Sequence, residues 1–535
     1  MLTLSTRLSH WMLALLCALY LLAGTVGHDP WKIDDAIHLG IAWEFANNGN
    51  WLTPRIGVDS LGGIAPLYHW VAAALGESLA WLLPFHDAAR LASALFGALM
   101  LVGLAMTDTA LGSGEQSAWR APILAIGTLG LLQPIHDAQP AIAVLAAQAF
   151  IYAGIAILKK NVAAGTAIAG LALATGLWSG GLIAAPALLP PFAFALMAKD
   201  WRNPKMLAGS AIGLMAGIFI AALWPLLLES QGPEKIQSWM TTELGRFSLF
   251  GIDDYQLRDH LELLSWFVWP ILPVAIWSIW IKRRSLTDPP ILLPLVGSTF
   301  AFAEFFLLSD PKPLSSLHMI VPLVLLAVPG AERLRRGASN ALDWFGVMTF
   351  TFVAGLIWLG GVAIATGEPA RVAKNFYKAE PGFVGHLSIG AFIAAGLLTV
   401  AWLWVLFGMP RSPLRSLIRW AAGVTLMWGL IATLWLPWID FGKTYRPVAQ
   451  SLEKALTQKS ECVASKDVGL AQMASLRYFI GLATLPLDEK RQCPLLLIQG
   501  ASGKEPELKG MKKIWEGNRG GDKSERLRLY RGKPI

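Results

Sequence analysis

The chain has 535 residues, of which 55% are hydrophobic and 15% are charged, and its formal net charge is +8. Soluble domains have about 25% charged residues, so this composition excludes an ordinary soluble protein and indicates that lipid contacts much of the surface. The positive charge does not indicate a nucleic-acid partner, because the basic residues lie in short runs between apolar segments.

Apolar segments occupy most of the chain up to residue 438, and a helix needs about 20 apolar residues to cross the hydrocarbon core. The first segment, 8–26, has no convincing cleavage site and is interpreted as a retained signal anchor. The long segment 163–198 is interpreted as two helices, because Trp178–Gly181 predicts a tight outer turn. The sequence predicts an α-helical polytopic membrane protein with about thirteen transmembrane helices, at residues 8–26, 88–111, 119–135, 139–158, 163–179, 181–198, 206–228, 262–282, 289–308, 314–331, 342–366, 385–408 and 417–438.

The loops between these segments alternate in their content of Lys and Arg, which are enriched in cytoplasmic loops. The turns at 136–138 and 179–181 contain neither residue, whereas the loop 367–384 contains both and breaks the alternation. Elsewhere the pattern predicts that the N-terminus is inside and that residues 439–535 are outside. The loops expected in the cytoplasm contain Lys159-Lys160, then Lys199, Arg202 and Lys205, then Lys282 to Arg284, then Arg333, Arg335 and Arg336, and then Arg411, Arg415 and Arg419.

The segments expected outside that are too long to be turns are 27–87, 229–261 and the C-terminal stretch. In the first, residues 37–45 have an amphipathic pattern expected to lie in the membrane interface. The apolar stretch 66–83 is likewise expected to be interfacial rather than spanning.

The composition changes after residue 438, where Lys, Glu and Arg become frequent. Apolar runs at 495–498 and 527–530 predict strands, and 447–458 predicts a helix. The sequence therefore predicts two domains, a transmembrane domain at 1–438 and a small soluble periplasmic α/β domain at 439–535.

The cysteines give neither a disulfide framework nor a metal motif. Cys462 and Cys493 both fall in the C-terminal stretch. They are expected either to form a disulfide in an oxidising compartment or to remain two independent buried thiols.

Carboxylates and cations gather on the predicted outer side. Asp34 and Asp35 follow the first span, and Asp137 lies in the short turn before the fourth. Each acid alone is explained equally well as a helix N-cap or first-turn acid. Each cation alone is more typical of a side chain that extends toward lipid headgroups. Together the acids and cations suit a reaction on an anionic lipid; the cations are Arg55, Arg246 and Lys312.

Short motifs occur in order along residues 1–330: Asp34–Glu44 with Gly49–Arg55, Pro66–Trp70, His136–Ala138, Glu243–Phe247 and Ser309–Pro322. As an ordered set they resemble the motifs of bacterial aminoarabinose lipid A transferases and protein O-mannosyltransferases. These are glycosyltransferases of the GT-C class (family 39-like). The resemblance implies a GT-C fold and a multi-pass enzyme of the bacterial inner membrane, with its C-terminal domain in the periplasm.

The implied reaction transfers a hexose or pentose from a polyprenyl-phosphate donor to lipid A, another glycan or a protein, with inversion at the sugar carbon. Membrane lipids, this lipid-linked sugar and the acceptor are the expected partners. Such a reaction needs a carboxylate that orients or deprotonates the acceptor, and cations that stabilise the departing phosphate. We expect the base to be Asp34, the positioning acids Asp35 and Asp137, the phosphate ligands Arg55, Arg246 and Lys312, and further outer-face candidates His69, Glu243 and Tyr68.

No cofactor is predicted beyond the lipid-linked sugar. A divalent metal is not required, because the sequence has no cluster of His, Asp and Glu with ligand spacing. A zinc site built from His69 and an acid stays open.

The chain departs from the family pattern in two places. Where the family commonly has Glu-Lys-Pro-Pro, this chain has Gly63-Ile64-Ala65-Pro66, and a second common lysine corresponds to Ser179. The loss of these charges puts the identity of donor and acceptor in question.

Two other functions remain open from the sequence. A secondary transporter would place ionisable residues near the bilayer midplane within broken helices, whereas here Arg90, Asp108 and Glu304 lie near the ends of their spans. A catalytically degenerate scaffold of the same fold is the second alternative, because the Glu-Lys pair is missing.

Overall fold

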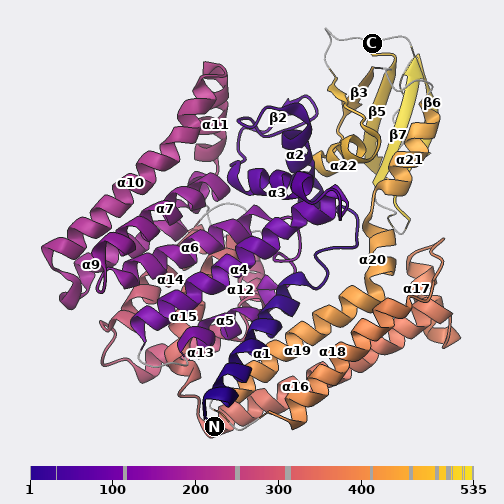
Figure 1. Ribbon diagram of the computed structural model, residues 1–535. Coiled ribbons are helices and arrows are strands. Elements are labelled where there is room, and N and C mark those ends of the chain that lie inside the picture. Colours follow the sequence, from indigo (N-terminus) through magenta and orange to yellow (C-terminus); the bar gives the residue numbers. More distant parts are fainter. Residues whose placement is uncertain are drawn as a thin grey trace.

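The structure is a computed structural model that describes residues 2–31, 33–112, 117–247, 254–307, 315–409, 412, 414–456, 462–487, 493–501, 508, 510–520, 522 and 525–532. Helices make up most of it, and a small sheet lies at the C-terminal end (Figure 1). The chain is therefore a multi-pass helical protein with its larger sheet in a separate C-terminal region.

Eight helices within the described ranges are long and apolar enough to cross a membrane. They are α4 (Phe85–Leu111), α6 (Pro140–Ile157), α7 (Val162–Gly180), α10 (Pro204–Glu229), α14 (Pro289–Leu307), α16 (Arg336–Thr366), α18 (Ile389–Phe407) and the continuous run of α19 (Arg415–Leu430), the π-helical turn Ile431–Trp435 and α20 (Leu436–Lys443). A ninth span results if α12 (Asp254–Phe267) and α13 (Ile271–Ile281), which meet at 86°, are counted together.

The observed helices differ from the thirteen expected spans in identifiable places. In the segment 119–135, α5 (Ser117–Ile126) ends early at Gly127, and a 3₁₀ turn that contains Gly130 follows (Leu129–Leu131). In the segment 181–198 prolines divide the chain into short pieces, which are the 3₁₀ turn Leu182–Ala184, α8 (Ala185–Leu188), the 3₁₀ turn Pro190–Ala193 and α9 (Phe194–Met197). Two further apolar helices are not among the eight: α1 (Leu2–Leu22), which has 21 residues, and α15 (Ile320–Ala331), which has 12 residues and follows the 3₁₀ turn Ser315–Met319.

Small residues allow the central helices to approach closely. α6 packs against both α4 and α7. A Cβ atom placed on Gly154 of α6 would lie 2.6 Å from the backbone nitrogen of Ala169 in α7, so only glycine fits there. Small residues at helix contacts are typical of membrane proteins, where packing rather than water exclusion drives association.

A layer of short elements covers one end of these helices. It contains α2 (Asp34–Asn48), β1 (Arg55–Ile56), β2 (Asp59–Ser60), α3 (Leu67–Ser78) and α11 (Pro233–Gly245). Figure 1 shows this layer at the end of the molecule opposite the N-terminus. α2 and α3 correspond to the two stretches expected to be interfacial, and neither is among the helices that are long enough to span. A further short helix, α17 (Ala370–Ala379), follows α16.

The C-terminal region contains a five-stranded mixed sheet with the order β4-β3-β5-β7-β6. β3 is parallel to β4 and β5, whereas β7 is antiparallel to β5 and β6. The predicted strands at 495–498 and 527–530 and the helix near 447–458 are confirmed as β5, β7 and α21. The elements are α21 (Arg446–Ala455), β3 (Val463–Lys466), α22 (Leu470–Ile480), β4 (Leu485–Pro486), β5 (Leu495–Ala501), β6 (Met511–Gly517) and β7 (Glu525–Gly532).

Cys462 and Cys493 form a disulfide, so of the two expectations for these thiols the pairing is the one observed. They lie next to Val463 and two residues before Leu495, which are register partners in the neighbouring strands β3 and β5. The disulfide therefore joins the beginnings of two strands of one sheet.

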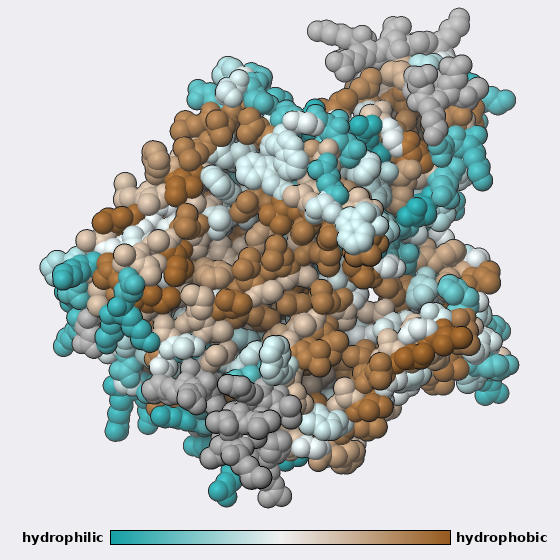
Figure 2. All heavy atoms as spheres, in the orientation of Figure 1, coloured by the Kyte–Doolittle hydropathy of each residue, from teal (hydrophilic) through white to brown (hydrophobic). Residues whose placement is uncertain are grey.

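The C-terminal region packs on the short-element layer through α22 and α2. Gly40 of α2 lies against Ala474 of α22, and the Arg477 guanidinium is 2.7 Å from a buried carboxylate oxygen of Glu44. Figure 2 shows hydrophobic side chains over the helices and hydrophilic ones concentrated at the C-terminal sheet and at the far lower-left edge. This distribution fits a lipid-embedded helical body with polar ends.

Candidate active site

A cavity of about 730 Å³ lies where the short-element layer meets the ends of the long helices. Its walls come from α2, the segment 63–65 before α3, the beginning of α6, the end of α7, the end of α11, α14 and the first residue of α22. The cavity is large enough for a sugar and part of a lipid phosphate. The polar side chains that line it are Asp34, His38, Gln139, Ser179, Thr242, Arg246, Glu304 and His318.

The adjacent acids Asp34 and Asp35 face different surroundings, because successive residues on a helix are about 100° apart. Asp34 is half-buried and lines the cavity. Asp35 is buried and accepts hydrogen bonds from Arg90 (3.1 and 3.0 Å) and from the backbone N–H groups of Trp31 (2.9 Å) and Ala138 (2.7 Å). Burial alone would raise the pKa of Asp35, but the charge and hydrogen bonds of Arg90 lower it to about 2. Asp35 is therefore an ionised carboxylate held within the protein, and Asp34 is the acid at the cavity.

Asp137 lies in the turn before α6, directly before the residue whose N–H group binds Asp35. Its backbone oxygen accepts a hydrogen bond from Ser93 Oγ (2.6 Å), and its carboxylate accepts one from Gln133 Nε2 (3.3 Å). Burial and the nearby Asp35 carboxylate raise the pKa of Asp137 to about 7. The structure thus brings the two acidic motifs together, but Asp137 is not among the residues that line the cavity.

The raised pKa of Asp137 predicts a pH-dependent stability. In the unfolded chain an Asp carboxyl has a pKa of about 3.9, so between about pH 4 and 7 the folded protein binds the proton more tightly. This contribution to stability is fully present below about pH 4 and is lost as pH rises through about 7. Asp137→Asn, which cannot ionise, should therefore raise Tm relative to wild type more at about pH 8.5 than at about pH 5, as measured by thermal unfolding of the detergent-purified protein. An equal difference at both pH values would contradict the prediction.

Arg246 is fixed at the cavity by the buried acid Glu243. The Glu243 carboxylate accepts hydrogen bonds from Arg246 Nη1 (2.8 Å) and from the N–H group of Leu182 (2.5 Å). Gly181 has φ of +74°, and a Cβ atom there would lie 2.3 Å from Glu243 Oε2, so glycine is required for this approach. The predicted break after the fifth apolar segment is found at Gly181, whereas Trp178, Ser179 and Gly180 still belong to α7, and this break positions Glu243.

Three other predicted site residues do not line the cavity. Arg55 lies half-buried in β1. Tyr68 is buried, contacts Ser93 Oγ at 2.7 Å and accepts a hydrogen bond from the N–H group of Gln139. His69 is buried behind His38. Lys312 lies outside the described residues.

His69 does not fit as a zinc ligand, although the sequence left that role open. Its Nδ1 donates to the Ala65 carbonyl oxygen (3.1 Å), and its Nε2 is 3.0 Å from His38 Nδ1. Both ring nitrogens are therefore already used in hydrogen bonds. Within the described ranges no three or more His, Cys, Asp or Glu residues are grouped so that they could hold a metal ion.

Three further ionisable residues line the cavity and were not among the predicted site residues. His38 follows Asp34 by four residues, a spacing that predicts the same helix face. Glu304 Oε1 and His318 Nδ1 form a buried pair at 2.8 Å. The sequence contained a signal for this pair, because Glu304 and His318 are both ionisable residues within apolar segments. Ionisable groups in a membrane usually pair with one another.

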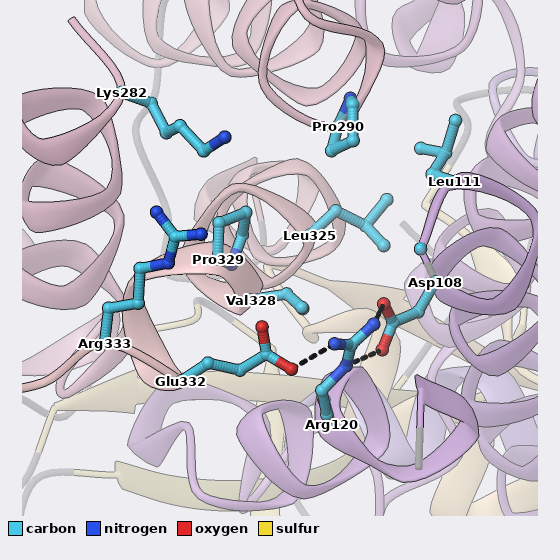
Figure 3. Close-up of a pocket in the computed structure, with 11 residues that line it drawn as sticks. Asp108, Leu111, Arg120, Lys282, Pro290, Leu325, Val328, Pro329, Glu332 and Arg333 are labelled. Atoms are coloured by element: carbon cyan, nitrogen blue, oxygen red, sulfur yellow. Dashed lines mark hydrogen bonds and ion pairs between the residues drawn. The ribbon is translucent and has the colours of Figure 1, made fainter. Parts of the chain in front are cut away.

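A second, smaller cavity of about 200 Å³ lies at the C-terminal end of α4, whereas Arg90, which binds Asp35, lies near the beginning of this 27-residue helix. Figure 3 shows the Arg120 guanidinium between the carboxylates of Asp108 and Glu332, with Lys282 and Arg333 on the other side. The Arg120–Asp108 hydrogen bonds are 3.0 and 2.5 Å. These ion pairs join the ends of α4, α5 and α15, so Asp108, Arg120 and Glu332 are paired with one another.

Comparison with solved structures identifies the fold. Two structures of ArnT from Cupriavidus metallidurans, one bound to undecaprenyl phosphate and one in the apo state, match with TM-scores of 0.67 and 0.66 at 17% identity. They cover 98% and 99% of this chain and 98% of their own. The archaeal oligosaccharyltransferase AglB from Archaeoglobus fulgidus, in complex with an inhibitory peptide and a dolichol-phosphate, matches with a TM-score of 0.50 at 11% identity, over 92% of this chain and 70% of its own. No protein-family model matches the sequence, and no curated protein matches it.

The chain therefore has the fold of the GT-C membrane glycosyltransferases, as its ordered motifs predicted. The match extends over nearly the whole chain, including the C-terminal sheet. The fold defines the class of protein, and the chemistry must be argued from the cavity.

Proposed function

We propose that this protein is a glycosyltransferase that transfers a sugar from a polyprenyl-phosphate donor to an acceptor at the periplasmic face of the inner membrane. The observation that carries the proposal is the cavity that contains Asp34 and Arg246, in a fold shared with an ArnT structure that binds undecaprenyl phosphate. A carboxylate and a guanidinium in one cavity at the end of apolar helices suit a donor with a lipid tail and a phosphate.

In the proposed reaction an acceptor oxygen attacks the anomeric carbon, and the bond from that carbon to the phosphate oxygen breaks. Asp34 takes the proton from an acceptor hydroxyl, and polyprenyl phosphate leaves with the bonding electrons. Arg246, oriented by Glu243, binds the phosphate oxygens as their charge increases. Asp35 and Asp137 position the first turn of α2 through Arg90 and Ala138.

The arrangement of charges favours a transferase over a secondary transporter. Asp108, Arg120 and Glu332 are paired at one end of the helices, and Asp34 and Arg246 lie at the other. A transporter would need its coupling charges near the bilayer midplane.

The test is mass spectrometry of lipid A, surface polysaccharide and periplasmic proteins from cells with and without the gene. We expect one defined sugar to be lost in the deletion strain and restored by the wild-type gene. That result would also name the sugar and the acceptor. No difference in any fraction, in cells shown to produce the protein, would favour the scaffold or the transporter.

A further inference from the structure

A pair of histidines presents one ring nitrogen to the cavity. His38 of α2 lines the cavity, and its Nδ1 lies 3.0 Å from Nε2 of the fully buried His69. His69 Nδ1 in turn lies 3.1 Å from the backbone oxygen of Ala65. The three groups form a chain of hydrogen bonds from the backbone to the cavity.

The carbonyl at one end of this chain fixes the protons of both rings. A carbonyl oxygen only accepts, so His69 Nδ1 must carry a hydrogen. In a neutral ring His69 Nε2 is then the acceptor, and His38 Nδ1 must be the donor. His38 Nε2 is left with an unshared electron pair.

Burial keeps both rings neutral. It lowers the pKa of His38 to about 4, and burial together with the neighbouring His38 lowers the pKa of His69 well below its usual value. Nε2 of His38 has no hydrogen-bond partner among the described residues, and it is not one of the fully enclosed polar atoms without a partner. It is therefore an accessible acceptor on the wall of the cavity.

The charged neighbour of His38 on α2 is Asp34, one turn earlier. The segment Gly63, Ile64 and Ala65, which also lines the cavity, forms a wall without charge. A phosphate oxygen would be repelled by the electron pair of Nε2, whereas a hydroxyl group can donate to it. An uncharged wall with one acceptor suits a polyol such as a sugar.

We propose that Nε2 of His38 binds a hydroxyl group of an uncharged sugar, which belongs either to the donor or to the acceptor glycan. His69 is a positioning residue that holds His38 in the required tautomer. This inference rests on the proposed function and specifies which part of the substrate lies against α2.

The variant that tests it is His38→Asn. Asparagine can still donate an amide hydrogen toward His69 Nε2, but it has no atom in the place of His38 Nε2, so the fold should be kept. With the donor and acceptor named by mass spectrometry, we expect kcat/KM to fall about 10-fold, the size of one lost hydrogen bond. A higher KM for the donor would assign the hydroxyl to the donor sugar, and a higher KM for the acceptor would assign it to the acceptor.

The control is His386→Asn, at an exposed histidine away from the cavity, which should transfer sugar at the wild-type rate. Unchanged kinetics of His38→Asn in an assay where the wild type is active would overturn only the role of His38. No transfer by the wild type would overturn the proposed function itself. Nitrogen-15 NMR of labelled histidine provides a readout that needs no activity, since a protonated His38 Nε2 at neutral pH would also overturn the proposal.

Discussion

Replacement of Arg90 by methionine should strongly destabilise the protein and lower both its yield and its Tm. Arg90 is completely buried and binds the carboxylates of Asp35 (3.0 Å) and Asp87 (3.2 Å). Its guanidinium also donates to the backbone oxygens of Thr25 and Asp29. Removal of one partner of a buried ion pair leaves an uncompensated charge and costs about 3–5 kcal/mol. That is a large part of the roughly 5–15 kcal/mol by which a typical protein is stable.

The measurement is the yield of monodisperse protein after detergent extraction, together with Tm. Arg371→Met is the matched control, because Arg371 is exposed on α17 and its loss should leave both values unchanged. The double variant Arg90→Met with Asp35→Asn should recover part of the yield, since one of the stranded charges is then removed. An Arg90→Met variant with the wild-type Tm would contradict the structural role assigned to this arginine.

Arg90 also illustrates why the site was only partly predictable. The sequence showed a basic residue near the beginning of a span, but its main partner, Asp35, lies 55 residues earlier in the chain. Local patterns predict helices and turns from neighbouring residues, whereas such a pair forms only when α2 packs against α4. The same limit applies to Glu243, whose contact with the N–H group of Leu182 joins two distant segments.

The fold was more predictable where local chemistry decides the structure. Seven of the expected apolar segments correspond to long helices, because an uninterrupted apolar run of about 20 residues favours a continuous helix; they are α4, α6, α7, α10, α14, α16 and α18. The prediction of one continuous helix was wrong where prolines and glycines interrupt an apolar segment, as in 181–198. The mean hydropathy of a segment changes little when it contains one proline, whereas that proline removes a backbone hydrogen bond and can end the helix.

Adjacent residues of the same type have different surroundings in the structure, and the sequence did not predict this difference. Asp34 and Asp35 are identical in type, yet one lines the cavity and the other binds Arg90. The sequence did not show whether the departures from the family pattern lie near the candidate site. Gly63, Ile64 and Ser179, where charged residues were expected, all line the cavity. The three positions therefore contribute uncharged side chains to the wall of the cavity.

Asp34→Asn should lower the rate of sugar transfer by about 10²–10⁴-fold, the usual contribution of a general base. Asp34 lines the cavity from the first turn of α2, while Asp35 holds that turn through Arg90, so the substitution should leave the fold intact. Transfer by purified protein with the donor and acceptor named by mass spectrometry gives the rate, and Tm reports the fold. Asp59→Asn, in the nearby strand β2 and away from the cavity, is the matched control.

The size of the Asp34→Asn effect also reports on the acceptor. A hydroxyl must lose its proton during transfer, whereas an ionised phosphate attacks without a base, so a mild effect would point to a phosphate acceptor. A large effect would agree with the uncharged wall formed by Gly63, Ile64 and Ala65 and would favour a hydroxyl. Asp137→Asn should slow transfer less than Asp34→Asn, because Asp137 acts through the position of α2 rather than on the substrate. If the Asp34→Asn and Asp137→Asn variants both transferred sugar at the wild-type rate, the carboxylates would have to be removed from the mechanism, and the reaction would have to be sought elsewhere in the cavity.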